Sequence, residues 1–480
     1  MSLLVIDVGT SAVRAAIVNP DAQITHEARR EVLPSTPAPG LVEFDAAAMA
    51  DAALDCANEV LAAVGSVTAV GITNQRASTI VWDRSSGVPV GPGIGWQDLR
   101  TVGDCLALQA EGLRLAPNLS ATKLAHLLDQ HDPERVRDLC FGTVDSWIAW
   151  RLSQGAVHVS DLSNAAVTGL VDREGRGWDQ RVLDILRVPV EVLPTIVDTT
   201  EVVGEASALP GAPPIAALVG DQQASLVGQG CVAPGPAKIT FGTGGMLDTV
   251  YGPDRPGFDT RGGGGTFPIV TWRRDGRVMW GIEAIMLSAG SNVEWLRDDL
   301  GVIESVEQSH DVAAACTDTD GVVYVPALLG LGTPFWDYGA RGTLLGLTRG
   351  TGRPQLVRAV LEGVAQRGAD LVEAAELDGG TPIPAVRVDG GMSRNPTFVQ
   401  ALANACGRPV EVSPVVEATT LGAALLAGLT TGTWVGWDDI AATWRPREVV
   451  EPNGKLDRDR WREAVERAKG WHAELSALDF

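Results

Sequence analysis

Two apolar runs in this chain lead into the same kind of small-residue turn, one near the start and one near the middle. The first run passes Asp7 into Gly9-Thr10-Ser11 and continues as a second apolar run over residues 13–18. The second, residues 237–241, leads into Gly242-Thr243-Gly244-Gly245 and continues through Met246. Glycine and threonine in such turns leave backbone N–H groups and hydroxyls available to an anion. The repeat predicts two β-hairpins that hold one triphosphate between them, although either turn alone is also compatible with an ordinary tight turn.

Length and charge restrict the class of protein. A chain of 480 residues exceeds what one hydrophobic core usually serves, so two domains are expected. With 45% hydrophobic and 20% charged residues, the composition is that of a globular protein. The formal net charge of −22 and the lack of clustered Lys and Arg argue against nucleic acid as a partner. A small-molecule partner is therefore expected.

The cysteines and the length of the apolar runs indicate the cellular compartment of the protein. The six cysteines are scattered, without a CxxC pair or a Cys/His cluster at zinc spacing. Free thiols of this kind fit a reducing cytosol. We see neither a signal peptide at the start of the sequence nor an apolar run long enough to cross a membrane. We therefore expect a cytoplasmic protein that does not interact with membranes.

Short β-rich runs alternate with helical ones, which is typical of α/β layers. We expect strands at 67–72, 78–82 and 385–388, and helices at 46–64, 136–152, 282–300, 355–376, 395–406 and 457–469. Pro and Gly are frequent between 209 and 236, and we place the boundary of two domains there, at 1–230 and 231–480.

Glycines follow the expected strand at 385–388, in Asp389-Gly390-Gly391-Met392, just before a helix. Such glycines expose backbone donors and leave space for a nucleotide. Neither a Walker GxxxxGK[ST] sequence nor a well-placed GxGxxG occurs, which disfavours a P-loop or Rossmann site. Small residues at 419–424 predict a helix that packs closely over this strand.

Long segments of the chain resemble the FGGY carbohydrate kinases, most closely the glycerol kinase branch. The segments that carry the resemblance span nearly the whole chain in the family's order, among them DVGTSAVR, GITNQR, GWQDLR, SATKL, HVSDLSNAAVTGL, GDQQASLVGQG, FGTGG, WLRD, VRVDGGMSRN and TTLGAALLAGL. The resemblance implies two actin-like, ribonuclease-H-like α/β domains with an ATP and substrate cleft between them. It further implies transfer of phosphate from ATP with Mg²⁺ to a small polyol or sugar, and a homodimer.

The resemblance also implies roles for individual residues. Asp221, in Gly-Asp-Gln-Gln, matches the general base that accepts the proton of the substrate hydroxyl, although an Asp after Gly is more commonly a turn residue or helix cap. Asp7 matches the carboxylate that organises Mg²⁺, directly or through bound water, and Asp221 lies near the same ion. The nucleotide-binding residues implied by the family pattern are Thr10, Ser11, Arg14, Thr243, Gly244, Gly290, Gly390, Gly391, Met392 and Asn395. Arg14 is also compatible with a solvated strand position.

For the carbon substrate, Arg76, Trp96, Asp221 and Gln222 match the glycerol kinase pattern, while four positions depart from it. Ala77 replaces a Glu that holds a terminal hydroxyl, and Asn118, Met246 and His126 replace a Tyr and two other aromatic residues. Loss of such a hydrogen bond typically costs about 1–3 kcal/mol. We therefore predict a widened pocket that contains Ala77, Asn118 and Met246 and takes a longer polyol or a sugar.

Three alternatives stay open. Glycerol kinase proper is the second interpretation, and a kinase of xylulose or another pentulose is less favoured because NQR stands where those enzymes carry a QMHG-like segment. The third is a non-catalytic, nucleotide-gated protein on the actin-like fold, because a fold does not dictate a function. The presence of Asp7, Arg76, Asp221 and Gln222 together favours an enzyme.

Overall fold

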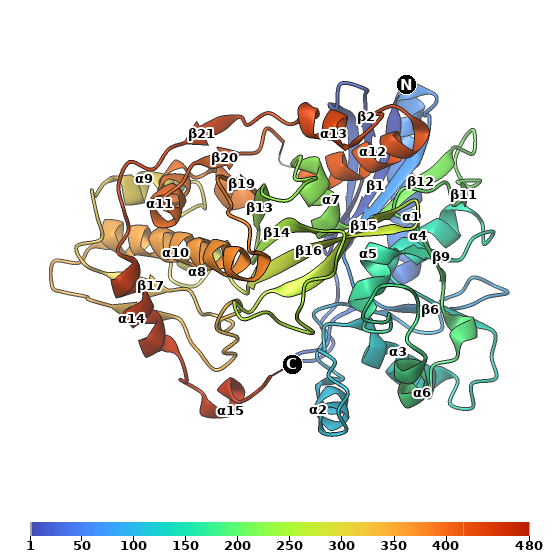
Figure 1. The fold of residues 1–480 in the computed structure, drawn as a ribbon, viewed down its shortest axis with the longest axis horizontal. Coiled ribbons are helices and arrows are strands. Elements are labelled where there is room, and N and C mark those ends of the chain that lie inside the picture. Colours follow the sequence, from blue (N-terminus) through green and yellow to red (C-terminus); the bar gives the residue numbers. More distant parts are fainter. Residues whose placement is uncertain (1, 416, 480) are drawn as a thin grey trace.

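Two mixed β-sheets with helices on their faces form the two halves of the molecule (Figure 1). The computed structural model describes residues 2–415 and 417–479. The cysteines are free, with Cys56, Cys105, Cys140 and Cys231 buried and the other two partly exposed. No helix in the described residues is both long and apolar enough to cross a membrane.

The first sheet has six strands in the order β11-β12-β5-β1-β2-β3. Its strands are β1 (Leu3–Val8), β2 (Ala12–Val18), β3 (Ile24–Glu31), β5 (Val70–Asn74), β11 (Gly204–Glu205) and β12 (Pro214–Gly220). The pairs β1/β2 and β2/β3 are antiparallel, whereas β5 runs parallel to both β1 and β12. The strand expected at 67–72 is β5, which begins later, at Val70, and extends to the polar residue Asn74.

The second sheet repeats this pattern, in the order β15-β16-β14-β13-β19-β20-β21. Its strands are β13 (Ala237–Phe241), β14 (Gly245–Gly252), β15 (Phe267–Arg274), β16 (Arg277–Met286), β19 (Val386–Asp389), β20 (Val410–Val412) and β21 (Glu448–Val450). The antiparallel run β16-β14-β13 and the parallel strands β19 and β20 correspond to β3-β2-β1, β5 and β12. The duplicated α/β architecture predicted from the two turns is confirmed.

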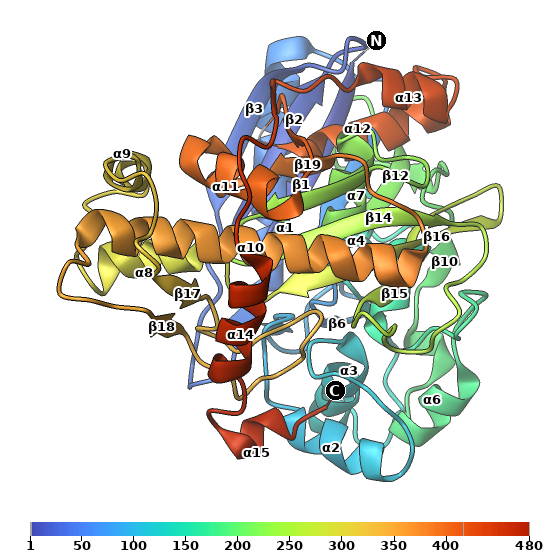
Figure 2. The ribbon, with the colours of Figure 1, turned by 60° about the vertical axis from the view of Figure 1, so that its left-hand side comes forward.

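Helices α1 (Ala46–Val64), α10 (Arg353–Gly379), α11 (Pro396–Cys406) and α14 (Arg458–Ala468) lie where the sequence predicts them, the first three from apolar periodicity and α14 as a charged helix. Figure 2 shows α10 running across one face of the second sheet. Two predicted helices are partly wrong. Residues 136–152 contain β8 (Leu139–Gly142) before α4 (Val144–Leu152), and residues 282–300 contain the end of β16 before α8 (Ser291–Asp298). Both stretches are largely buried on both faces and mostly apolar, with Glu283 as the charged exception, and such a short run does not distinguish a strand from a helix.

Smaller elements complete the fold. The strand expected at 78–82 is β6 (Ile80–Asp83), which pairs with β8 outside the main sheets. The remaining elements are β4 (Glu43–Phe44), β7 (Gly93–Ile94), α2 (Val102–Ala110), α3 (Ser120–His131), β9 (Val159–Asp161), α5 (Leu162–Ala165), α6 (Gln180–Leu186), β10 (Thr195–Val197), α9 (Gln308–Ala314), β17 (Val323–Val325), β18 (Thr343–Leu345), α13 (Trp437–Thr443), α15 (Ala473–Ser476) and short 3₁₀ turns at 166–168, 190–192 and 391–394.

Helix α12 (Ala418–Thr431) belongs by sequence to the second half but packs on the first sheet, against β1, β5 and β12 and against α7 (Asp221–Gly228). The expectation that it covers the strand at 385–388 is wrong. Its small residues serve a different close contact, because a Cβ at Gly422 would lie 1.8 Å from the Ala224 carbonyl oxygen and one at Gly228 would lie 1.9 Å from that of Ala418. The backbones of α7 and α12 therefore touch.

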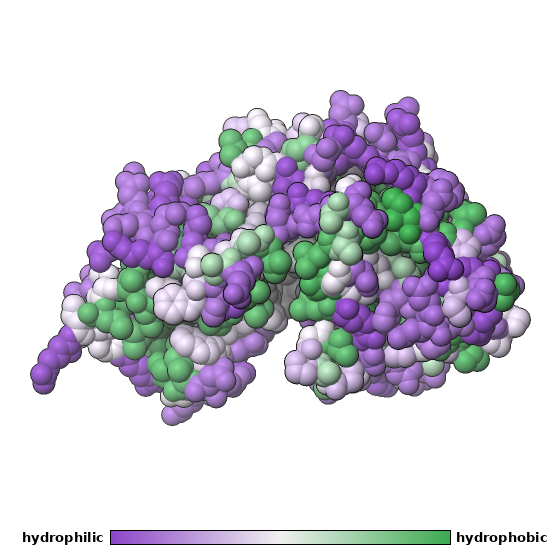
Figure 3. Space-filling model, turned by 90° about the horizontal axis from the view of Figure 1, so that it is seen from below, coloured by the Kyte–Doolittle hydropathy of each residue, from purple (hydrophilic) through white to green (hydrophobic). Residues whose placement is uncertain are grey.

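A hollow separates the two halves when the molecule is seen from below (Figure 3). We keep the division into 1–230 and 231–480 as a proposal, since α7 ends at Gly228 and β13 begins at Ala237. Gln109 of α2 donates to the backbone oxygen of Asp479 at 2.8 Å, so the C-terminal segment contacts a helix of the first half.

Candidate active site

Asp221 and Arg76 meet at the carboxyl edge of the first sheet. Asp221 begins α7 directly after β12, and Arg76 follows the neighbouring parallel strand β5, so both lie where a ligand of an open α/β sheet usually binds. Arg76 Nε lies 3.4 Å from Asp221 Oδ1, which also accepts a 2.8 Å hydrogen bond from the backbone N–H of Gln222. Burial raises the pKa of Asp221, and Arg76 acts in the opposite direction.

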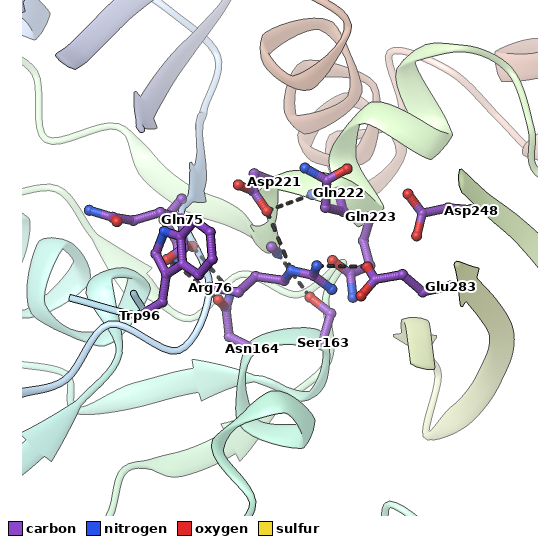
Figure 4. A network of polar contacts seen from close by, with 12 residues as sticks. Gln75, Arg76, Trp96, Ser163, Asn164, Asp221, Gln222, Gln223, Asp248 and Glu283 are labelled. Carbon is purple, nitrogen blue, oxygen red and sulfur yellow. Dashed lines mark hydrogen bonds and ion pairs between the residues drawn. The ribbon is translucent and has the colours of Figure 1, made fainter. Parts of the chain in front are cut away.

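Arg76 also reaches across to the second half. Its Nη2 donates to Glu283 of β16 at 2.6 Å, and Figure 4 shows Trp96 and Glu283 on opposite sides of Arg76. Its Nη1 is buried and has no hydrogen-bond partner in the described residues. A buried donor without a partner is costly, so Nη1 is suited to a ligand oxygen.

A polar network beneath Asp221 fixes the ends of β5 and β12. Ser163 accepts a 3.0 Å hydrogen bond from the Gly220 N–H, and its own hydroxyl donates to Asp161. Asn164 and Asn74 exchange two side-chain hydrogen bonds, of 2.9 and 3.2 Å. This network comes from the HVSDLSN segment and was not predicted to support the site.

One buried lysine joins the two segments expected to form the substrate pocket. Lys123 of α3 is fully buried and donates to the backbone oxygens of Trp96 and Asn118, both at 3.2 Å. Burial lowers the pKa of Lys123 to about 7. A neutral amine still supplies two N–H donors, which is enough for two carbonyl groups. Sequence reasoning missed Lys123, although a charged residue within an apolar helical stretch was the available signal.

The residues predicted to line the substrate pocket differ in their exposure and in their hydrogen bonds. Ala77 is buried, with φ of +60°, and its carbonyl oxygen accepts from Ser120 at 3.0 Å. The Asn118 residue is exposed. Trp96 is half-buried, and its indole N–H donates to Thr10 Oγ1 at 3.2 Å, which ties the expected substrate wall to the first turn.

The first turn connects β1 and β2, where Asp7 and Arg14 are directly opposite. Arg14 Nη1 lies 4.0 Å from Asp7 Oδ2 and forms an ion pair with Glu417, while Thr420 of α12 donates to Asp7 Oδ2 at 2.8 Å. Burial raises the pKa of Asp7 to about 6, with Arg14 acting in the opposite direction. Glu417 and Thr420 were not predicted, because the sequence does not show that α12 reaches the first sheet.

The second turn, with Thr243 and Gly244, packs against the predicted nucleotide residues. The Gly290 N–H donates to the Gly242 oxygen at 2.9 Å, and a Cβ at Gly290 would lie 2.6 Å from that oxygen. Gly390 has φ of +83°, and a Cβ there would lie 2.4 Å from the Phe241 oxygen. Glycine is therefore required at both positions for the segments to meet.

Other predicted residues have structural contacts of their own. Asn395 caps α11 by accepting from the Phe398 N–H at 3.1 Å and donates to Ser309 at 2.9 Å. Met246 is half-buried on β14, opposite Thr240 and Ile285. Gly391 and Met392 lie in the 3₁₀ turn between β19 and α11, with Met392 buried near Gly290. Contacts of these residues with a nucleotide or a substrate stay predictions.

The two halves of the chain match the two domain models of one family. The model for the FGGY family of carbohydrate kinases, N-terminal domain, matches residues 2–228, and that for the C-terminal domain matches residues 237–431. A curated glycerol kinase of Aromatoleum aromaticum is 42% identical, with 98% of this chain and 99% of that protein covered.

Solved structures agree in fold along the whole chain. The crystal structure of Plasmodium falciparum glycerol kinase with ADP has a TM-score of 0.89 at 27% identity and covers 100% of this chain and 99% of that one. A xyloylose kinase from Brucella ovis has a TM-score of 0.86 at 25% identity, with 100% of both chains covered. Since family models match both halves and a curated member is similar end to end, this chain belongs to the FGGY family of carbohydrate kinases and is an ATP-dependent kinase of a small polyol or sugar.

Proposed function

We propose that Asp221 is the general base of this kinase and that the substrate hydroxyl lies between Asp221, Arg76 and Trp96. The observation that carries the proposal is the position of Asp221: a partly exposed carboxylate at the sheet edge, 3.4 Å from an arginine whose Nη1 is buried and has no hydrogen-bond partner in the described residues. As the hydroxyl oxygen bonds to the γ-phosphorus of ATP, its proton passes to Asp221 and the bond from phosphorus to the bridging oxygen breaks, so that ADP leaves.

Arg76 orients the substrate through its free Nη1, and Trp96 supplies an apolar wall. The two turns hold the phosphates, with Thr10, Ser11 and Arg14 on one side and Thr243 and Gly244 on the other. The residues at 290 and 390–395 hold the adenosine. Positioning and charge stabilisation are what phosphoryl transfer chiefly requires of a protein.

The carboxylates at the first turn fit Mg²⁺. Asp7 is half-buried near the negative charges of Glu417 and Asp221, which raise its pKa further, and a cation at this point would relieve that repulsion. In the described residues no group of three or more acidic, His or Cys side chains is arranged to hold a metal ion. Mg²⁺ is commonly held by one or two carboxylates together with substrate phosphates. Asp7, directly or through water, and Asp221 would hold the ion, which neutralises phosphate charge when bound.

For the substrate, we favour a longer polyol or a sugar. Ala77 is buried and lacks the carboxylate that the glycerol kinase pattern places there, and Asn118 and Met246 replace larger aromatic side chains. The pocket therefore has fewer acceptors and more room than a site built for a three-carbon substrate.

Glycerol is the second candidate. It is favoured by the 42% identity with the glycerol kinase of Aromatoleum aromaticum along the whole chain and by the retention of Arg76, Trp96, Asp221 and Gln222. A homodimer and a cytoplasmic location follow from the family resemblance and the sequence alone, and both stay predictions.

The substrate is tested by following ADP formation with Mg²⁺ and a panel of glycerol, tetritols, pentitols, ketopentoses and hexoses. We expect a tetritol, pentitol or ketopentose to have the highest kcat/KM. Ala77→Glu should raise kcat/KM for glycerol relative to that substrate, by about tenfold for one restored hydrogen bond. A wild-type preference for glycerol by a wide margin would instead establish the glycerol kinase interpretation.

A second prediction concerns Lys123. Lys123→Met should raise KM for the carbon substrate by about tenfold, because two backbone carbonyls lose their donor and the Trp96 and Asn118 segments separate. KM for ATP should change less than about twofold. Lys123→Arg retains the donors and serves as the comparison. Equal effects of Lys123→Met on both KM values would contradict this role.

A further inference from the structure

Three buried charged side chains form a row on the face of the second sheet that looks toward Asp221. Lys238 of β13 pairs in register with Asp248 of β14, and Asp248 pairs in register with Glu283 of β16. Residues directly opposite on antiparallel strands point to the same face. The side chains of Lys238 and Asp248 are fully buried, that of Glu283 is 7% exposed, and Lys238 Nζ lies 2.6 Å from Asp248 Oδ2.

Both ends of this row hold a residue expected to bind the substrate. At one end Lys238 donates to Gln222 Oε1 at 2.7 Å, and at the other Glu283 accepts from Arg76 at 2.6 Å. Figure 4 shows Gln222 above the guanidinium end of Arg76, Glu283 beside it and Asp248 farther to the right. Because Arg76 also contacts Asp221, and Gln222 follows Asp221 in the chain, these contacts and the cross-strand pairing of Asp248 with Glu283 close a ring of six residues: Asp221, Gln222, Lys238, Asp248, Glu283 and Arg76.

Asp248 is the member of this ring that does not touch the expected substrate residues itself. It lies between their two holders, in ion-pair contact with Lys238 and directly opposite Glu283 on the neighbouring strand. Beyond the ion pair with Lys238, its two oxygens find no hydrogen-bond partner in the described residues. Burying a carboxylate costs free energy unless partners at fixed positions compensate for its lost hydration. We therefore expect the burial of Asp248 to serve a specific role in the site.

The positive and negative charges of the six ring residues nearly balance one another. Three carboxyl groups face two cations, so full ionisation would leave one uncompensated negative charge in a buried site. Burial and the neighbouring Asp248 raise the pKa of Glu283 well above its usual range, against the effect of Arg76. A protonated Glu283 would carry no charge, which would remove the excess negative charge of the ring. Asp389 of β19, next to β13, is the further carboxylate that interacts with both Lys238 and Asp248.

We propose that Asp248 is a positioning residue that couples Gln222 to Arg76 and so fixes the spacing of the two groups that select the carbon substrate. Through Lys238 it sets where the Gln222 amide lies, and through Glu283 it sets where the Arg76 guanidinium lies. The proposal deepens the function proposed above and rests on the assigned roles of Arg76 and Gln222. It makes Asp248, which no part of the expected pocket contains, a determinant of specificity.

The test compares Asp248→Asn with the wild type. The variant keeps the size of the side chain but weakens the contact with Lys238. We expect KM for the carbon substrate to rise by about tenfold and KM for ATP to change less than twofold, the former corresponding to one charged hydrogen bond. Asp370→Asn is the matched control, because Asp370 is a buried carboxylate of the same half that pairs with Arg367 and Arg458, outside the ring. It should lower stability and leave both KM values unchanged.

Coupling is measured with a double-mutant cycle. If Asp248 acts on the substrate through Gln222, the effects of Asp248→Asn and Gln222→Ala on KM should be strongly non-additive, whereas independent sites add. Additive effects, or equal changes in the two KM values of Asp248→Asn, overturn the proposal. If Asp248→Asn does not fold, Lys238→Met tests the ring from its other side and should raise KM for the carbon substrate alone; an unchanged KM overturns it.

The same measurements separate this proposal from the proposed function. If Gln222→Ala and Arg76→Ala leave KM for the carbon substrate unchanged, the assigned substrate site is wrong, and the coupling through Asp248 falls with it. If both raise that KM and Asp248→Asn does not, the site stands and the positioning role of Asp248 is wrong.

Discussion

Asp221→Asn is expected to lower kcat by about 10²–10⁴-fold, the usual contribution of a general base. An amide does not accept the proton of the hydroxyl as the new bond to phosphorus forms. Arg76 remains held by Glu283 at 2.6 Å, so the substrate contact is preserved. ATP affinity should change little, because the turns and the adenosine segment are untouched. Steady-state ADP release gives kcat, and titration with a non-hydrolysable ATP analogue gives the affinity.

The pH profile provides a control for this result. Because burial raises the pKa of Asp221, its ionised form is lost at a higher pH than for an ordinary Asp, and kcat/KM of the wild type should fall on the acid side from that higher pH. The residual activity of Asp221→Asn should lack this acid limb. Near-normal turnover of the variant, or an unchanged acid limb, would show that another group takes the proton.

Gly422→Ala is expected to destabilise the protein by about 1–3 kcal/mol and to reduce activity. The added Cβ would lie 1.8 Å from the Ala224 backbone oxygen of α7, so the two helices must separate. Since α7 begins with Asp221 and Gln222, their separation moves the proposed base and a substrate residue together. Chemical denaturation measures the change in the free energy of unfolding.

Gly103→Ala is the matched control for Gly422→Ala, because it also adds a Cβ to a helical glycine. Gly103 lies in α2, and a Cβ there would meet nothing within 4 Å. Alanine is favoured over glycine in a helix by about 1 kcal/mol, so this variant should be as stable as the wild type or more stable. If Gly422→Ala were equally harmless, the close contact of α7 and α12 would not be what holds the two helices in place.

The parts of the fold that could be predicted are those that the local sequence determines. The hairpins at Asp7 and Thr243 follow from small residues between apolar strands, and α1 and α10 follow from periodicity alone. The error at 282–300 arose because Ile282–Met286 is buried on both faces and carries no alternation to read. The candidate site was predictable only where a family pattern marks it.

Contacts between segments far apart in the chain could not be predicted from the sequence. Thr420 reaches Asp7 and Glu417 reaches Arg14 across more than four hundred residues because α12 returns to the first sheet, and nothing near position 417 indicates this. Lys238 and Asp248 read as polar residues in ordinary strands, which typically face solvent on one side of a sheet. Only the register of β13, β14 and β16 places them together beneath the site.

The return of α12 has a consequence for how the chain folds as it is made. The first sheet is complete once residue 220 has left the ribosome, yet the apolar residues of one face, including Leu3, Val5 and Val219, are covered by Leu421, Leu425 and Leu426. About two hundred further residues must be synthesised before that cover exists, which takes about 10–40 s at the usual rate of elongation. During this interval the nascent first half presents an uncovered apolar surface, so it is the stage of synthesis at which a chaperone would be needed most.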